Sequence, residues 1–191
     1  MVDIHPRQGR GGRPHKSTSG AALNWERLTW RHIPQAEDFG DGEFLESLPL
    51  RELGERLIQE YDELNWLADY SVRYLWKASG GKSSGNPTLG KCILTSGLVL
   101  YFAHVDWVIW LGADWLREFE FNEDKVEALL YHELLHPVLK EQKEGKPPKP
   151  GARGHDFEDF TDVIRRYGFW FDNLQRVKKA VQGRLALEAQ P

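Results

Sequence analysis

The spacing of hydrophobic and polar positions first predicts an amphipathic helix in the first half of the chain. From Leu50 to Trp76 apolar residues recur every three or four positions, namely Leu53, Leu57, Tyr61, Leu64, Ala68, Val72 and Leu75. This spacing places apolar side chains on one face of a helix, either continuous or broken once near Asn65. The glycine- and serine-rich run from Ser79 to Pro87 is expected to form a loop that ends this helix.

After this loop the pattern changes to short runs of branched and aromatic residues, which predict strands. These runs are Cys92 to Thr95, Leu98 to Ala103 and Val105 to Leu111. We therefore expect a small sheet to follow the first helix.

A second helix is predicted from about Glu123 to His136. Asn122 is a suitable N-cap, and Glu123 and Asp124 place acidic side chains in the first turn, where the helix dipole favours them. At about 100° per residue, one side of this helix is apolar and the other carries His132 and His136. The apolar side consists of Val126, Leu130 and Leu134.

Two further helices are expected in the last part of the chain. A basic, proline-rich loop from Lys140 to Arg153 precedes a helix that begins near His155, and its polar face carries His155, Glu158, Asp159, Asp162 and Arg166. The last helix is expected from Asp172 to Leu187, with a core-facing stripe of Leu174, Val177, Val181 and Leu185. Together these elements predict an α+β fold with a small, mostly antiparallel sheet.

Composition favours one folded domain behind an N-terminal tail. A chain of 191 residues that is 40% hydrophobic can bury one core, so we expect residues 21–191 to form a single domain. Residues 1–20 are glycine-rich, contain several basic side chains and carry almost no large apolar residue after Pro6. Such a segment is typical of a disordered basic tail.

Charge and cysteine content argue against several classes of protein. The net charge of −4 disfavours a general binder of polyanions, and Cys92, the only cysteine, excludes an internal disulfide. The segment Met1 to Pro6 lacks the apolar core of a signal peptide, and no run reaches the roughly 18 apolar residues of a membrane span. We therefore expect a cytoplasmic protein.

The motif with the most specific chemistry is H-E-x-x-H at His132 to His136, followed nineteen residues later by His155. Histidines at i and i+4 of a helix point the same way and can hold one zinc ion. Catalytic zinc takes three protein ligands and keeps one position for water, so His155 is the candidate third ligand. Glu133 would take a proton from the attacking water and deliver it to the leaving amine.

Alternatives remain for these residues. A surface helix whose histidines face solvent or cap a carbonyl, with Glu133 as an ordinary exposed acid, explains the pentad without a metal. It does not explain His155. If His155 points away, Glu158 or Asp159 becomes the third ligand. Asp156 and Asp159 are candidates to hydrogen-bond the second nitrogen of a ligating histidine. Tyr131 and Tyr167 could each donate to a developing oxyanion.

From about Leu64 to Trp170 the sequence resembles the phage metallopeptidase family, which consists of minimal zincins from phages and prophages. The matching stretches are Tyr74-Leu75-Trp76 before a Gly-Gly-Lys loop, 105–109, 128–136, 155–160, Arg166-Tyr167-Gly168 and Trp170. The resemblance implies a zincin-like fold and a zinc-dependent peptidase acting in a bacterial host or phage-infected cell. It also implies that the strand from Val105 to Leu111 forms the sheet edge where an extended peptide pairs.

Two other functions stay open at this point. One is a catalytically silent zinc-binding interaction or inhibitor protein, although the presence of Glu133 disfavours it because structural zinc needs no general base. The other is a protease for DNA-bound proteins, like the Spartan-type zincins, in which the basic tail and the Lys140 to Arg153 loop contact phosphates. The sequence does not identify a substrate, a cleavage preference or an oligomeric state.

Overall fold

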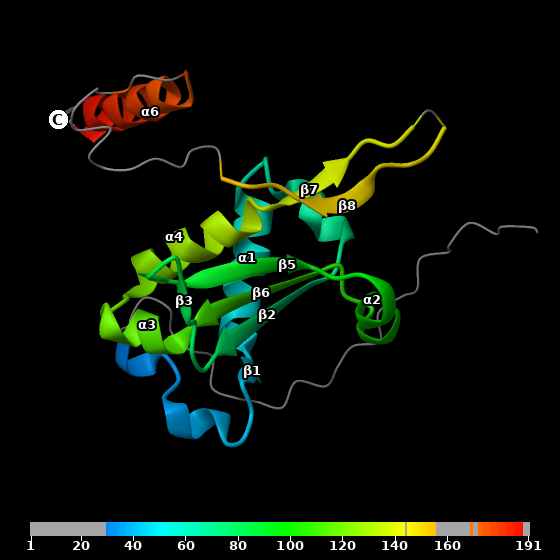
Figure 1. Ribbon diagram of the computed structural model, residues 1–191. Helices are drawn as coiled ribbons and strands as arrows, with labels where there is room; N and C mark the ends of the chain where they lie inside the picture. Colours follow the sequence, from blue (N-terminus) through cyan, green and yellow to red (C-terminus); the bar gives the residue numbers. More distant parts are fainter. Residues whose placement is uncertain (1–29, 144, 156–168, 170–171, 189–191) are drawn as a thin grey trace, which may run out of the picture.

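The computed structural model describes residues 30–143, 145–155, 169 and 172–188. Its centre is a four-stranded sheet in the order β1-β2-β6-β5, with helices packed against it (Figure 1). The fold is therefore α+β, as the sequence predicts. The tail at 1–20 and the helix expected after His155 lie outside the described residues.

The sheet is mixed but mostly antiparallel. Strand β1 (Phe44–Glu46) pairs antiparallel with β2 (Val72–Lys77), and β2 pairs parallel with β6 (Trp107–Gly112). Strand β6 also pairs antiparallel with β5 (Gly90–Leu94). Because β6 lies between two strands, the expectation that it forms the sheet edge is wrong. The edge beside the histidine motif is β5.

Helices α1 (Leu48–Glu60) and α4 (Glu123–Leu134) cover one face of this sheet. Buried residues of β2 and β6 pack against these two helices in one hydrophobic core. The core includes Leu53, Leu57, Tyr74, Trp76, Trp107, Ile109, Leu111, Leu116, Leu130 and Leu134, and Trp107 is 0% exposed. The amphipathic pattern around residues 50–60 thus predicts α1 and its buried face correctly.

Two segments differ from the sequence-based expectation. The first is Val72 to Trp76: the helical interpretation is wrong, because this segment is β2, where Tyr74 and Trp76 are buried and Arg73 is exposed. Before it, the break expected near Asn65 is confirmed by a 3-10 helix, η4 (Asn65–Asp69).

The second is the segment 98–103, which is expected to be a strand but forms helix α2 (Gly97–Ala103). An apolar run of this length has no periodicity that distinguishes a strand from a helix.

Helix α4 agrees closely with its prediction. The Asn122 side chain accepts a hydrogen bond from the backbone N–H of Lys125 at 3.1 Å, which makes it the N-cap. Pro137 stops the helix and begins β7 (Pro137–Lys140), which pairs antiparallel with β8 (Lys149–Ala152). Of the segment 140–153, which is expected to be a loop, Lys140 and residues 149–152 therefore lie in strands.

The remaining described elements are short or peripheral. They are η2 (Trp30–His32), η3 (Ala36–Phe39), the small hairpin of β3 (Lys82–Ser83) and β4 (Asn86–Pro87), α3 (Ala113–Glu118) and α6 (Asp172–Glu188). Helix α6 confirms the last predicted helix. Its core-facing stripe is not confirmed, because Val181 and Leu185 are 51% and 59% exposed and no described element covers them. Within the described ranges, no helix is both long and apolar enough to span a membrane.

Candidate metal centre and active site

Helix α4 separates its buried residues from its two histidines, as its sequence pattern predicts. Val126, Leu130 and Leu134 are at most 1% exposed in the core, whereas His132 is exposed and His136 is half-buried. The helix is therefore fixed by its apolar face and presents both imidazoles outside the core.

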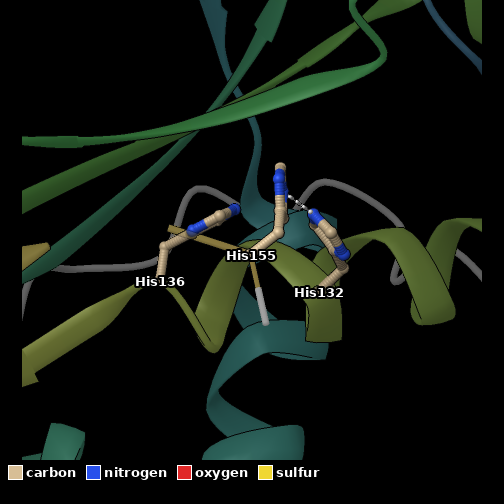
Figure 2. Close-up of side chains that lie close together, drawn as sticks. All are labelled: His132, His136 and His155. Carbon is tan, nitrogen blue, oxygen red and sulfur yellow. Dashed lines mark hydrogen bonds between the residues drawn. The ribbon is translucent and has the colours of Figure 1, made fainter. Parts of the chain in front are cut away.

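The side chain of His155 joins this pair from the segment after β8 (Figure 2). Nε2 of His155 lies 3.1 Å from Nε2 of His132, and one nitrogen from each of the three rings lies within 4.8 Å of the others. Tetrahedral zinc with bonds of about 2.0 to 2.1 Å needs nitrogens about 3.3 Å apart. The three histidines form a group that could hold a metal ion after a small contraction.

The backbone of Arg153 fixes the position of the third histidine. The N–H of Arg153 donates to the carbonyl of His136 at 2.9 Å, and Nδ1 of His136 lies 2.8 Å from the carbonyl oxygen of Arg153. The hairpin before it is also anchored, because Nε1–H of Trp107 donates to the carbonyl of Gly151 at 3.2 Å. His155 is thus only two residues beyond a segment held against the end of α4.

The same contact sets the tautomer of His136. A carbonyl oxygen can only accept, so Nδ1 of His136 carries the proton and Nε2 keeps a lone pair for a metal. Sequence reasoning missed this orienting group because backbone contacts leave no side-chain pattern. Its own candidates, Asp156 and Asp159, lie outside the described residues, as do the alternative ligands Glu158 and Asp159.

Burial lowers the pKa of His132, and the neighbouring His136 and His155 lower it further. A low pKa keeps an imidazole neutral, which is the form that binds metal. Partial desolvation and the two neighbouring imidazoles therefore favour the neutral, ligating form of His132.

Glu133 lies on the buried side of the cluster and is 4% exposed. Burial raises the pKa of its carboxyl to about 7, although a hydrogen bond from the Cys92 backbone lowers it. Its Oε2 atom is 3.9 Å from Nε2 of His136 and has no hydrogen-bond partner among the described residues. One carboxylate oxygen is thus directed toward the histidine cluster without a partner.

Strand β5 provides the space for this carboxylate. A Cβ atom added to Gly90 would lie 2.8 Å from Oε1 of Glu133 and 3.0 Å from Cδ2 of Leu111. Both distances are shorter than ordinary van der Waals contacts. Gly90 is therefore a site residue that the sequence analysis did not identify, because a glycine in a strand gives no chemical signal of its own.

Tyr131, one of the two oxyanion candidates, makes its hydrogen bond elsewhere. Its hydroxyl donates to Oε1 of Glu63, and this bond, more than burial, raises the pKa of Tyr131 to about 12. Tyr131 is not among the residues that line the histidine cavity. The other candidate, Tyr167, lies outside the described residues.

A cleft of about 1080 Å³ connects the histidine cluster with the edge of the sheet. It is lined by the β3 and β4 hairpin, by β5, by the exposed side of α4 and by the segment from Ala152 to His155. Figure 1 shows β5 as the edge strand nearest to α4, with the β7 and β8 hairpin beyond the end of the helix. The outer edge of β5, which lines this cleft, has no strand partner within the described residues.

Residues 42–182 match the family model described as "Putative phage metallopeptidase". No curated protein and no solved structure matches the chain. The matched segment contains α4, the histidine cluster and the whole of the four-stranded sheet. Because the match extends over far more than half of the sequence, the chain belongs to the phage metallopeptidase family.

Proposed function

We propose that the protein is a zinc-dependent peptidase in which His132, His136 and His155 hold the ion and Glu133 is the general base. The observation that carries this proposal is the convergence of three imidazoles beside a buried carboxylate oxygen that has no described partner. Three nitrogen ligands suit zinc, and a three-ligand set leaves one coordination position open. The membership in a family named for metallopeptidases supports the same assignment.

The protein's own residues would divide the chemistry as follows. A bound zinc ion would polarise the scissile carbonyl and make water acidic enough to attack at neutral pH. Glu133 accepts the proton of the attacking water and returns it to the leaving amine. The Arg153 carbonyl keeps His136 in its ligating orientation, and Gly90 leaves room for the Glu133 carboxylate.

The substrate is proposed to bind as an extended peptide along β5. The outer side of β5 is not paired with another strand in the described structure, and β5 lines the same cleft as Glu133. An extended peptide could add to this edge through backbone hydrogen bonds. The family further suggests action inside a bacterial host or a phage-infected cell.

Zinc content tests the metal assignment. We expect the purified protein to contain about one zinc ion per chain, because three neutral imidazoles form one nitrogen site. Elemental analysis measures the ratio, and removal of zinc with a chelator should lower the melting temperature because zinc binds the folded state. Protein without metal after growth in zinc-supplemented medium, and without recovery on adding zinc, would contradict the assignment.

Replacing Gly90 by alanine tests the proposed position of Glu133. The new methyl group would push the carboxylate away from the cluster, and we expect kcat to fall roughly 10- to 100-fold, since small displacements of reacting groups are costly. Zinc content should not change. Gly183→Ala in α6 is the control, because a Cβ there meets no atom within 4 Å. Full activity of Gly90→Ala would argue against this role.

A further inference from the structure

The cleft beside the histidine cluster is basic, although the whole chain carries a net charge of −4. Five cationic residues line it: Lys77, Lys82, Lys91, Lys125 and Arg153. Among the described lining residues Glu133 is the only acidic one, and it is buried. Positive charge is therefore concentrated where the substrate would bind.

Three of these cations are available to a ligand. Lys82, Lys91 and Lys125 are exposed, and none of them forms an ion pair within the described part of the chain. Lys82 lies over Trp115 at 5.5 Å and Lys125 over Phe121 at 5.6 Å. The Lys125 ammonium also donates to the carbonyl of Phe119 at 3.4 Å, which uses one of its three N–H donors and leaves two for a carboxylate. By contrast, Lys77 is paired with Glu43 at 3.1 Å.

Helix geometry places one of these lysines at a defined distance from the cluster. Lys125 and His132 are seven residues apart on α4, so they lie within about 20° of each other on the same face and about 10 Å apart along the axis. Ala128 and Leu129 line the cleft between them. An extended peptide rises about 3.3 Å per residue, so this separation corresponds to about three residues.

We propose that the cleft selects acidic peptide segments, with an Asp or Glu side chain of the substrate at Lys125, about three residues from the scissile bond. Lys82 and Lys91 would meet further carboxylates along β5. This inference rests on the proposed peptidase function and adds a substrate class to it. A peptide is favoured over a nucleic acid because the three lysines line the same cleft as β5. The outer edge of β5 has no strand partner in the described structure, and its backbone groups can pair with another extended polypeptide.

Binding to zinc-loaded Glu133→Gln protein tests this inference without turnover. The probe is a fluorescent ten-residue peptide rich in Asp and Glu, compared with the same peptide carrying Asn and Gln. We expect the acidic peptide to bind at least about tenfold more tightly at low salt, with the difference shrinking as salt screens the exposed charges. Three contacts of roughly two- to fivefold each give an effect of this size.

Charge-reversal variants test whether the three cleft lysines cause the preference for the acidic peptide. The triple variant Lys82→Glu, Lys91→Glu, Lys125→Glu should lose the preference for the acidic peptide with an unchanged melting temperature. The control triple Lys143→Glu, Lys178→Glu, Lys179→Glu alters the net charge equally at exposed positions outside the cleft, and it should keep the preference. Equal binding of both peptides, or equal losses in both triple variants, would overturn the inference.

Two further measurements separate this inference from its alternatives. A DNA duplex that displaces the acidic peptide and binds more tightly through the same three lysines would make the cleft a nucleic-acid surface and overturn the proposal. If the wild-type enzyme cleaves a mixed peptide library but shows no preference for acidic peptides, the result would contradict the inference and support the peptidase function. Selective binding of acidic peptides with no cleavage of any peptide would support the acidic selectivity of the cleft, but it would contradict the hydrolase assignment and the position given relative to a scissile bond.

Discussion

Replacing Glu133 by glutamine is expected to slow peptide cleavage at least about 100-fold, because the amide cannot take a proton from water at neutral pH. Glutamine has nearly the same size as glutamate and fits the space left by Gly90. Glu133 is not a proposed ligand, so zinc should remain bound. Burying a neutral amide is also less costly than burying a charge, so the melting temperature should not fall.

The comparison uses wild-type and variant protein at matched zinc occupancy, on a denatured protein or a peptide library. Equal cleavage by both would point to a contaminating protease or to another base. If the variant keeps full biological activity with zinc intact, the peptidase assignment fails. The protein would then be better described as a zinc-binding interaction protein.

Local patterns predict the part of the site that lies on α4. The N-cap at Asn122, the buried stripe and the placement of His132 and His136 opposite to it all follow from capping chemistry and a period of 3.6 residues. The spacing to His155 correctly indicated a third histidine in the same place. These features depend on residues close in sequence or on side-chain chemistry.

The remaining features depend on contacts between distant segments. The parallel pairing of β2 with β6 puts β6 inside the sheet, and no local pattern in 105–111 distinguishes an inner strand from an edge. Val72 and Leu75 happen to continue a helical spacing, but packing against the core selects a strand. In this strand the buried Tyr74 and Trp76 alternate with less buried residues. The roles of Gly90 and of the Arg153 carbonyl likewise arise only when β5 and β8 meet α4.

Replacing His155 by alanine is expected to lower zinc affinity by more than about 100-fold, since loss of groups that merely orient a ligand already costs 10- to 100-fold. Two histidines of α4 would remain, and a pair of nitrogen ligands holds zinc weakly. Peptide cleavage should fall with zinc occupancy and recover in part at high zinc concentration. Isothermal titration against a competing chelator measures the affinity. His155 is exposed, so the fold of the metal-free protein should be unaffected.

His32→Ala is the matched control, because His32 is an exposed histidine outside the cleft and the cluster. It should bind zinc like the wild type. Unchanged affinity in His155→Ala would move the third ligand to Glu158 or Asp159, and the same titration on Glu158→Gln and Asp159→Asn would identify which one. A loss confined to His155→Ala would establish that the zinc site is built from α4 and from the segment that Arg153 holds against its end.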